Sequence, residues 1–174
     1  LGFCLHPGAV LILRGANGSG KTTLLNILAG LRKPSDGQIT WQEQDIFSAR
    51  EFYHEDMHYI GHRSAIKNTL TVLQNLTFFS AIYDSHEALP ATIHFFGLEE
   101  VVDKPVYTLS EGWQRRVALA RLLQSQTKLW LLDEPLSHLD EETAELMLRL
   151  IAARYNQGGL TIMSTHGSVA FPGA

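Results

Sequence analysis

Apolar runs suited to strands alternate with amphipathic stretches at both ends of this chain. The apolar runs predict strands at residues 9–14, 38–41, 57–61, 129–132 and 160–165. Apolar residues at helical spacing, with turn residues after them, predict helices at 21–30, 71–83, 87–97, 110–124 and 141–155. Strands that alternate with helices indicate a parallel sheet covered by helices on both faces. The pattern therefore predicts an α/β fold.

Two parts of this pattern allow further predictions. The run "AVLILR" at 9–14 is almost wholly apolar, which is typical of a strand buried on both faces of a sheet. Between residues 60 and 125 the helical pattern dominates, so we expect a helical subdomain inserted into a single domain spanning residues 1–174. Inside it, Thr71 with Gln74 has the spacing of a capping box, and Ser110 is placed to cap the helix that follows.

Composition narrows the class of protein. The 174 residues are 45% hydrophobic and 18% charged, as expected for one globular domain, and the net charge of −4 argues against a nucleic-acid partner. Cys4 is the single cysteine, which excludes a disulfide framework and favours the reducing cytoplasm. No apolar run is long enough to span a bilayer. The chain lacks an initial Met and stops soon after a predicted strand, so we expect it to be truncated at both ends.

The stretch "GANGSGKTT" has the spacing of a phosphate-binding loop. Its glycines let backbone N–H groups turn toward phosphate oxygens, and the helix that follows adds the partial positive charge of its N-terminus. Lys21 can reach the outer phosphates, and the Thr22 hydroxyl can hold Mg²⁺. A simple glycine turn is the alternative, but the flanking strand and helix favour the phosphate loop. The predicted nucleotide-binding residues are Gly15, Asn17, Gly18, Ser19, Gly20, Lys21, Thr22 and Thr23.

Two carboxylates follow the apolar run "LWLL". Ligands of open parallel sheets bind at the carboxyl ends of the strands, which is where Asp133 and Glu134 lie. Asp133 is placed to hold Mg²⁺ opposite Thr22, and Glu134 to activate a water for attack on the γ-phosphate. Because a nucleotide kinase needs no such adjacent acid, hydrolysis is favoured over phosphotransfer. The alternative is two acids that cap the next turn.

A histidine ends the last predicted strand. His166 follows "LTIMST", which we expect to pair with the strand before Asp133. There its imidazole could bond the γ-phosphate and orient the attacking water. A lone histidine at a strand end is more often structural, but the phosphate loop and the paired carboxylates favour the catalytic interpretation.

A second predicted anion site begins the helix at 110–124. In "LSEGW", Ser110 and Gly112 lie where helix N–H groups and the helix dipole would face a bound anion. The alternative is an ordinary capped amphipathic helix. A chain of this length with two phosphate sites raises the question of which nucleotide the second one serves.

Together, "GANGSGKTT", "LSEGW", "LLDEP", "SHLD" and "MSTH" resemble, in order and spacing, the motifs of the ATP-binding-cassette (ABC) ATPases. The resemblance covers nearly the whole chain and implies a P-loop NTPase fold of the ABC type, with ATP and Mg²⁺. It also implies a head-to-tail pair of cassettes, formed by two copies of this chain and bound to integral membrane subunits. Each ATP would lie between one phosphate loop and the other chain's signature residues Ser110, Glu111 and Gly112. The loop from Ser137 to Asp140 resembles the D-loop that touches across this dimer.

Three features depart from the family pattern. Trp113 stands where the signature usually has glutamine. Counting back from "LTVLQNL" places His62, with Arg63 beside it, at the position of the Q-loop glutamine. The aromatic residue that stacks on adenine, together with the N-terminal edge strands, would precede this chain. His54, His58 and His62 fall four apart, but "MHYIG" predicts a strand, which argues against a helical metal or haem site.

Within the family, the stretches at 37–46 and 53–79 and the signature helix resemble the ATPase subunits of cytochrome c maturation haem exporters. This resemblance implies a peripheral subunit on the cytoplasmic face of the inner membrane, with no direct haem binding and no nucleic acid. It places the docking of a membrane partner beside His62.

Other functions stay open at this level. A general import or export ATPase shares most of these motifs. A nucleotide-binding regulatory module with little hydrolysis is favoured by Trp113 and by the absent glutamine, whereas Glu134 and His166 favour an enzyme. A DNA-repair cassette would carry a long coiled coil between the phosphate loop and the signature, and that interval is compact here.

Overall fold

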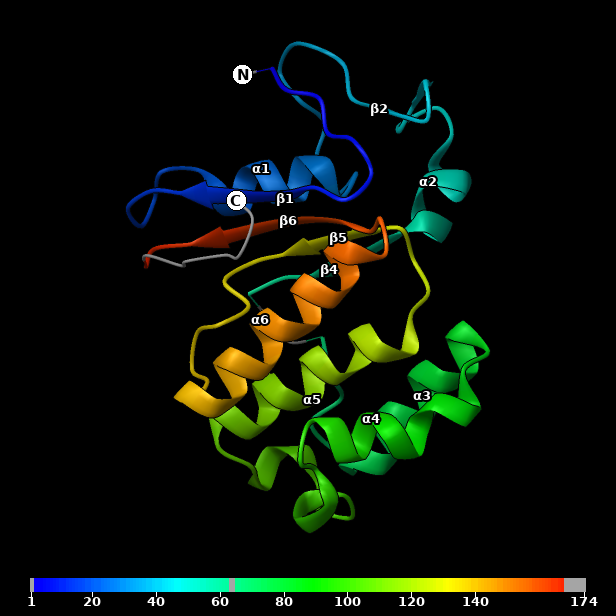
Figure 1. Cartoon of the computed structure of the whole chain (residues 1–174), viewed down its shortest axis with the longest axis vertical. Helices are drawn as coiled ribbons and strands as arrows, with labels where there is room; N and C mark the ends of the chain where they lie inside the picture. The colour runs from blue at the N-terminus through cyan, green and yellow to red at the C-terminus, as the bar shows by residue number, and fades with distance from the viewer. Residues whose placement is uncertain (1, 63–64, 168–174) are drawn as a thin grey trace. The chain divides into compact units, whose positions relative to one another are not determined.

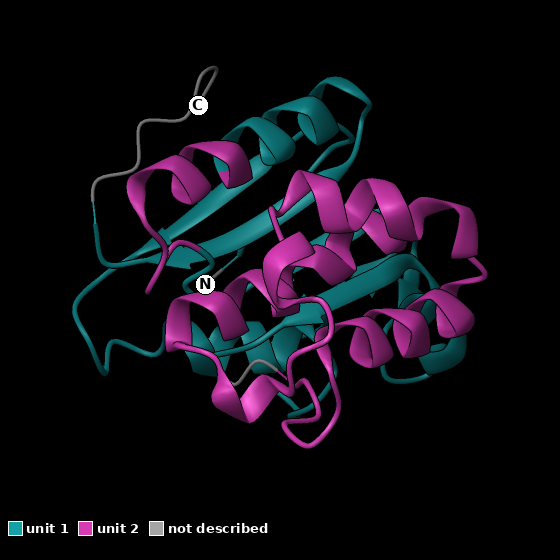
Figure 2. Ribbon diagram, turned by 90° about the horizontal axis from the view of Figure 1, so that it is seen from below, with its two compact units in different colours: residues 1–62, 127–135, 148–174 teal, residues 63–126, 136–147 magenta. Residues whose placement is uncertain are grey.

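The computed structural model describes residues 2–62 and 65–167, and these fall into two compact units. Unit 1 comprises residues 1–62, 127–135 and 148–174, and unit 2 comprises residues 63–126 and 136–147 (Figure 2). The sheet lies in unit 1, whereas the described part of unit 2 is built from helices and turns.

Unit 1 is built on a four-stranded parallel sheet with the strand order β1-β6-β5-β4 (Figure 1). Its strands are β1 (Val10–Arg14), β4 (Met57–Ile60), β5 (Leu129–Leu132) and β6 (Leu160–Thr165). All three strand pairs are parallel, with Leu132 opposite Met163 and Arg14 opposite Thr165. The carboxyl ends of these strands therefore meet at one edge of the sheet, and the predicted α/β fold is confirmed.

The core of unit 1 lies between the sheet and helix α1 (Lys21–Leu28). Every residue of β5 and of β6 is buried. Side chains two apart on each strand share a face, and Leu129, Leu131 and Ile162 pack in one cluster with Leu25 and Leu28 of α1. The opposite face carries Trp130, whose ring lies 4.1 Å from the Arg154 guanidinium. Buried on both faces, the two central strands fix the position of whatever follows them.

Strand β1 differs from its prediction. The run "AVLILR" predicts a strand buried on both faces, but Val10 to Leu13 are only half-buried and Arg14 is exposed. The reason is its place in the sheet, because among the described strands β1 pairs with β6 alone and forms an edge. Apolar composition sets how favourable burial is, but neighbouring strands decide whether burial occurs.

The rest of unit 1 is a short antiparallel hairpin and a helix. The elements are β2 (Thr40–Trp41), β3 (Gln44–Asp45) and α2 (Arg50–Asp56). Asp56 Oδ2 accepts hydrogen bonds from Trp41 Nε1 at 2.9 Å and from Lys128 Nζ at 3.0 Å, which joins the hairpin to the residue before β5. The two-residue turn of the hairpin, Gln42 and Glu43, has positive φ at both positions (49° and 67°) without glycine at either.

Unit 2 contains the helices of the middle of the chain and the first half of α6. Its described elements are α3 (Val72–Tyr83), η1 (His86–Ala88), α4 (Leu89–Phe95), η2 (Glu99–Val101), η3 (Val106–Thr108), α5 (Glu111–Gln124) and the start of α6 (Glu141–Asn156). The capping box of Thr71 and Gln74 is present, as the sequence predicts. Buried Gln124 of α5 donates to Leu76 O and Ser80 Oγ of α3, so these two helices are held together by polar contacts as well as by packing.

Across residues 2–62 and 65–167, no helix is both long enough and apolar enough to cross a bilayer.

The hairpin turn generates a stability prediction. Replacing Glu43 by glycine removes a side chain from a left-handed conformation, and we expect the free energy of unfolding to rise by about 0.5–1 kcal/mol. Urea unfolding of the two proteins measures it. Glu51→Gly, in the exposed first turn of α2, is the matched control and should lower the same quantity. Equal signs for the two substitutions would contradict the argument.

Candidate functional site

The phosphate loop of unit 1 has the backbone that its sequence predicts. Gly18 and Gly20 have φ of 80° and 95°, and Gly20 is the N-cap of α1. Gly15 faces the Ser19 side chain so closely that a Cβ would lie 2.6 Å from Ser19 Oγ. Lys21 Nζ donates to Gly15 O at 2.7 Å and to Ala16 O at 3.1 Å, which holds the amine over the loop. The loop therefore presents backbone N–H groups and one ammonium group to a common space.

A buried carboxylate joins this loop to the sheet. Asp133 is 1% exposed, and its Oδ2 accepts a hydrogen bond from Thr22 Oγ1 at 2.8 Å. Its other oxygen, Oδ1, accepts from Ser164 Oγ at 2.6 Å. The predicted pairing of Thr22 with Asp133 is thus present in the geometry, although these residues are 111 positions apart in the sequence.

Ser164 is a site residue that the sequence analysis did not identify. Its hydroxyl donates to Asp133 Oδ1 and accepts from the backbone N–H of Glu134 at 2.9 Å. Glu134 has φ of 47°, a left-handed conformation that is unfavourable for a glutamate, and the bond to Ser164 helps to hold it there. One signal was available, because the serine that follows "LTIM" in a fully buried strand needs a polar partner.

The acid and the histidine at the strand ends lie in contact. His166 Nδ1 and Glu134 Oε1 are 3.0 Å apart, with the Glu134 side chain 19% exposed and the His166 side chain 54% exposed. The parallel pairing of β5 with β6 brings them together and confirms the predicted neighbourhood of these strands. A carboxylate bonded to an imidazole at a solvent-accessible edge can accept and pass on a proton.

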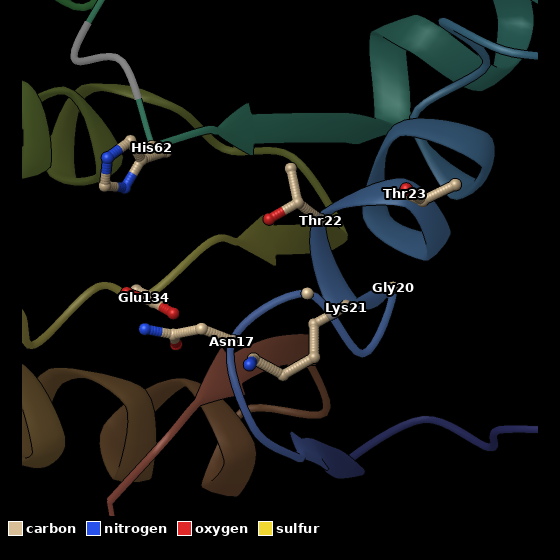
Figure 3. Close-up of a pocket in the computed structure, with 8 residues that line it drawn as sticks. Asn17, Gly20, Lys21, Thr22, Thr23, His62 and Glu134 are labelled. Carbon is tan, nitrogen blue, oxygen red and sulfur yellow. The ribbon is translucent and has the colours of Figure 1, made fainter.

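A pocket of about 410 Å³ opens beside the phosphate loop and Glu134. Figure 3 shows His62 and Glu134 on the side of this space opposite the helix that follows the phosphate loop. His62 is exposed, directly after Gly61 at the end of β4, while Arg63 lies outside the described residues. The lining residues are Asn17, Gly18, Gly20, Lys21, Thr22, Thr23, His62 and Glu134.

Two oxygen donors at and beside this pocket fit a magnesium ion. Thr22 Oγ1 and Asp133 Oδ2 are oxygen ligands of the kind that Mg²⁺ prefers, and they lie side by side. Mg²⁺ commonly takes few ligands from the protein and the rest from phosphate and water. Residues 2–62 and 65–167 contain no group of three or more His, Cys, Asp or Glu arranged to hold a metal. His54 lies on α2 and buried His58 on β4, so a strand interrupts their spacing as predicted.

The predicted signature residues lie in unit 2 at the start of α5. Ser110 is the N-cap, and its Oγ accepts from Trp113 N at 3.4 Å, which confirms the predicted cap. Glu111 Oε2 lies 3.2 Å from His138 Nδ1, and a Cβ on Gly112 would lie only 2.9 Å from His138 O. The signature turn therefore packs against the predicted D-loop segment, which runs from Ser137 to Asp140.

Asp140 links that segment to two helices. Its Oδ1 accepts from Thr143 N of α6 at 2.8 Å, and its Oδ2 forms an ion pair with Arg116 of α5. The bonds from the Thr143 side chain and backbone, and then the Arg116 guanidinium, hold the pKa of the Asp140 carboxyl below its ordinary value. Arg116 was not predicted as a site residue, and His138 was predicted only as part of the segment from Ser137 to Asp140, because their contacts depend on how the chain folds back on itself.

Comparison with known proteins identifies relatives of this chain. A family model described as "ABC transporter" matches residues 1–137. The "Cytochrome c biogenesis ATP-binding export protein CcmA" of Vibrio cholerae is 44% identical over 169 residues, which cover 95% of this chain and 82% of that protein. The protein of the same name from Rickettsia bellii is 44% identical over 166 residues, covering 95% and 83% of the two chains.

Solved structures show the same fold. An ABC transporter ATP-binding protein from Pyrococcus furiosus, described as putative, superposes with a TM-score of 0.80 at 24% identity, covering 95% of this chain and 82% of that one. An ATP-binding cassette described as a dimer in a post-hydrolysis state bound to ADP and Pi superposes with a TM-score of 0.82 at 23% identity, covering 95% and 78%.

The shared carboxylate of Asp133 generates a testable coupling. Ser164→Ala should lower the free energy of unfolding by about 1–3 kcal/mol, because a buried acceptor loses a donor. Thr22→Val removes the donor to the other oxygen, so the double variant should depart from additivity by about 0.5 kcal/mol or more. Urea unfolding of the four proteins measures this coupling.

A control pair uses Ser80, whose hydroxyl is bonded to Gln124 in unit 2. Ser80→Ala combined with Thr22→Val should be additive. Additive effects in the Ser164 pair as well would mean that the two hydroxyls do not act on one carboxylate.

Proposed function

The chain belongs to the ABC transporter family and, within it, to the cytochrome c biogenesis ATP-binding export proteins, and on that basis we propose how its residues act. It is an ATPase subunit coupled to export. Unit 1 binds ATP with Mg²⁺ and hydrolyses the γ-phosphate. Residues 1–174 form one cassette domain, in which the helices of about 60–125 are the inserted subdomain.

The observation that carries this proposal is the continuous set of contacts beside the phosphate loop. Thr22 is bonded to Asp133, Asp133 to Ser164, Ser164 to the backbone of Glu134, and the Glu134 carboxylate to His166. Lys21, Thr22 and Glu134 line one pocket, and beside it Asp133 is bonded to Thr22 and His166 to Glu134. Each of these groups can contribute to hydrolysis of a phosphoanhydride.

The phosphate loop and the first turn of α1 bind the phosphates of ATP. The N–H groups of residues 15–23 and the N-terminus of α1 surround the phosphates, and Lys21 neutralises charge on the outer ones. Thr22 and Asp133 hold the metal ion, and bound Mg²⁺ would neutralise the charge that develops on the phosphate oxygens. His62 lines the far side of the pocket and is assigned the place of the Q-loop glutamine.

Hydrolysis is assigned to Glu134 and His166. Water attacks the γ-phosphorus, the bond from that phosphorus to the β–γ bridging oxygen breaks, and ADP and phosphate form. Glu134 accepts the proton of the water, and His166 orients Glu134 and donates a hydrogen bond to the γ-phosphate. Because Glu134 is tied through its backbone to Ser164, its carboxylate is held in place before the substrate arrives.

The second anion site is assigned to a second cassette's nucleotide. Ser110 is the N-cap of α5, and Glu111 and Gly112 form the start of its first turn. Ser137 and Asp140 belong to the segment packed against them. In a head-to-tail homodimer these residues complete the site that the other copy's Lys21 and Glu134 begin. Two incomplete sites then become two complete ones only on association.

The partners are integral membrane subunits of a haem exporter, with the chain peripheral on the cytoplasmic face of the inner membrane. Their docking place is assigned to the region beside His62. Haem and nucleic acid are not assigned to this chain, which is acidic overall.

Substitution of the base tests the hydrolysis step. Glu134→Gln keeps the shape of the side chain but cannot accept the proton, so we expect the ATPase rate to fall by about 100-fold or more while ATP still binds. Steady-state phosphate release and equilibrium nucleotide binding measure the two quantities. Glu55→Gln, exposed on α2, is the matched control and should leave both unchanged. An undiminished rate in Glu134→Gln would remove Glu134 from the role of base.

Mixing two inactive variants tests the shared site. Lys21→Ala disables the phosphate loop and Ser110→Arg disables the signature, so each protein alone should be inactive. In a head-to-tail heterodimer one site receives both substitutions and the other receives neither. Equimolar co-expression should therefore restore about a quarter of the parent activity.

The other outcomes of the mixing experiment are equally informative. A mixture as inactive as its components would contradict the shared site. A parent protein that binds ATP and never hydrolyses it would support the regulatory module, which Trp113 and His62 favour.

A further inference from the structure

Trp113 stands where the signature usually has glutamine. In this structure its ring contacts a residue of its own chain. The centroid of the indole ring lies 4.7 Å from the Arg116 guanidinium carbon, one turn further along α5. This is the distance of a cation–π contact, which orients a guanidinium as well as attracting it. The ring is half-buried, so part of this contact is shielded from water.

Arg116 links Trp113 to the segment before α6. Its side chain is 20% exposed and forms an ion pair with Asp140 Oδ2. Asp140 Oδ1 in turn accepts the hydrogen bond of Thr143 N at 2.8 Å in the first turn of α6. Four residues in series therefore connect the signature turn to the start of another helix, and all four lie in unit 2.

The segment that receives this contact includes a residue with a left-handed backbone. His138 has φ of 63°, in a region that few residues other than glycine adopt and in which asparagine, aspartate and histidine are the commonest exceptions. Its carbonyl packs on Gly112 and its imidazole on Glu111. The Glu111 and His138 side chains are 82% and 56% exposed, so water and salt weaken that pair. The contact through Trp113 and Arg116 adds to this pair, with the Arg116 side chain 20% exposed and the Asp140 side chain 55% exposed.

We propose that Trp113 is a positioning residue that, through Arg116, holds Asp140 and the loop of residues 137–140 in register with the signature turn. Its ring limits the Arg116 guanidinium to the orientation that meets Asp140, which then caps α6. The consequence for catalysis rests on the proposed function, in which the signature turn and this loop meet the other cassette's nucleotide together. Trp113 thus acts through its neighbours and does not itself contact the nucleotide.

The direct test is hydrogen exchange of the Thr143 amide in the full chain without nucleotide. Trp113→Ala and Trp113→Gln should speed its exchange about three- to tenfold, because Arg116 no longer holds Asp140 as its acceptor. Trp113→Phe retains an aromatic face and should stay close to the parent. Tyr107→Ala removes a 66% exposed aromatic ring near the signature and should leave the exchange unchanged.

A second variant tests the same proposal if Trp113→Ala folds poorly. Arg116→Gln removes the cation and leaves the indole, and it should speed the exchange by a similar factor. Combining Trp113→Gln with Arg116→Gln should then add nothing further, because the two residues act in series. Unchanged Thr143 exchange in Trp113→Gln, or multiplying effects in the combination, would overturn the positioning role.

ATPase kinetics separate this inference from the proposed function. Trp113→Ala should lower kcat several-fold with a smaller change in KM, and Trp113→Phe should recover most of the loss. Faster Thr143 exchange with unchanged kcat would support the positioning contact and count against the assigned role of the loop in the dimer. Lower kcat with unchanged exchange would overturn the inference while leaving the ATPase assignment intact.

Discussion

The site of unit 1 depends on one buried carboxylate. Asp133 follows the fully buried strand β5, where an unpaired charge would be strongly destabilising. Thr22 from the phosphate loop and Ser164 from β6 each donate to a different oxygen of that carboxylate. Satisfying this one group therefore fixes three segments that are distant in sequence: the loop, the end of β5 and the end of β6. The positions of Glu134 and His166 follow from those of their strands.

Sequence patterns predicted the parts whose chemistry is local. The phosphate loop needs glycines at fixed spacing before a helix, and that spacing is readable because backbone conformation and residue type are coupled at Gly18 and Gly20. The cap at Ser110 and the capping box at Thr71 depend on residues three positions apart, so they were equally readable. The neighbourhood of Glu134 and His166 followed from the parallel pairing of their strands.

Other parts depend on contacts that no spacing reveals. Ser164 matters because it lies opposite Asp133, 31 positions away, and Arg116 because it reaches Asp140, 24 positions away. Strand β1 was expected to be buried on both faces from its composition, yet its exposure is set by the number of neighbouring strands. Trp113 looked like a departure from a motif, and only the fold supplied the partner for its ring. Tertiary context, and not residue type, decided each of these cases.

The left-handed backbone of Glu134 has a consequence for how this chain tolerates change. A glycine at that position would relax the backbone, so the substitution that local conformational energy favours there is one that deletes the carboxylate. Selection of variants for heat resistance alone would tend to enrich such a change, and screens that score only folded protein would rank it well. Substitutions at Glu134 that raise the stability of the cassette are thus limited by a trade-off between stability and activity.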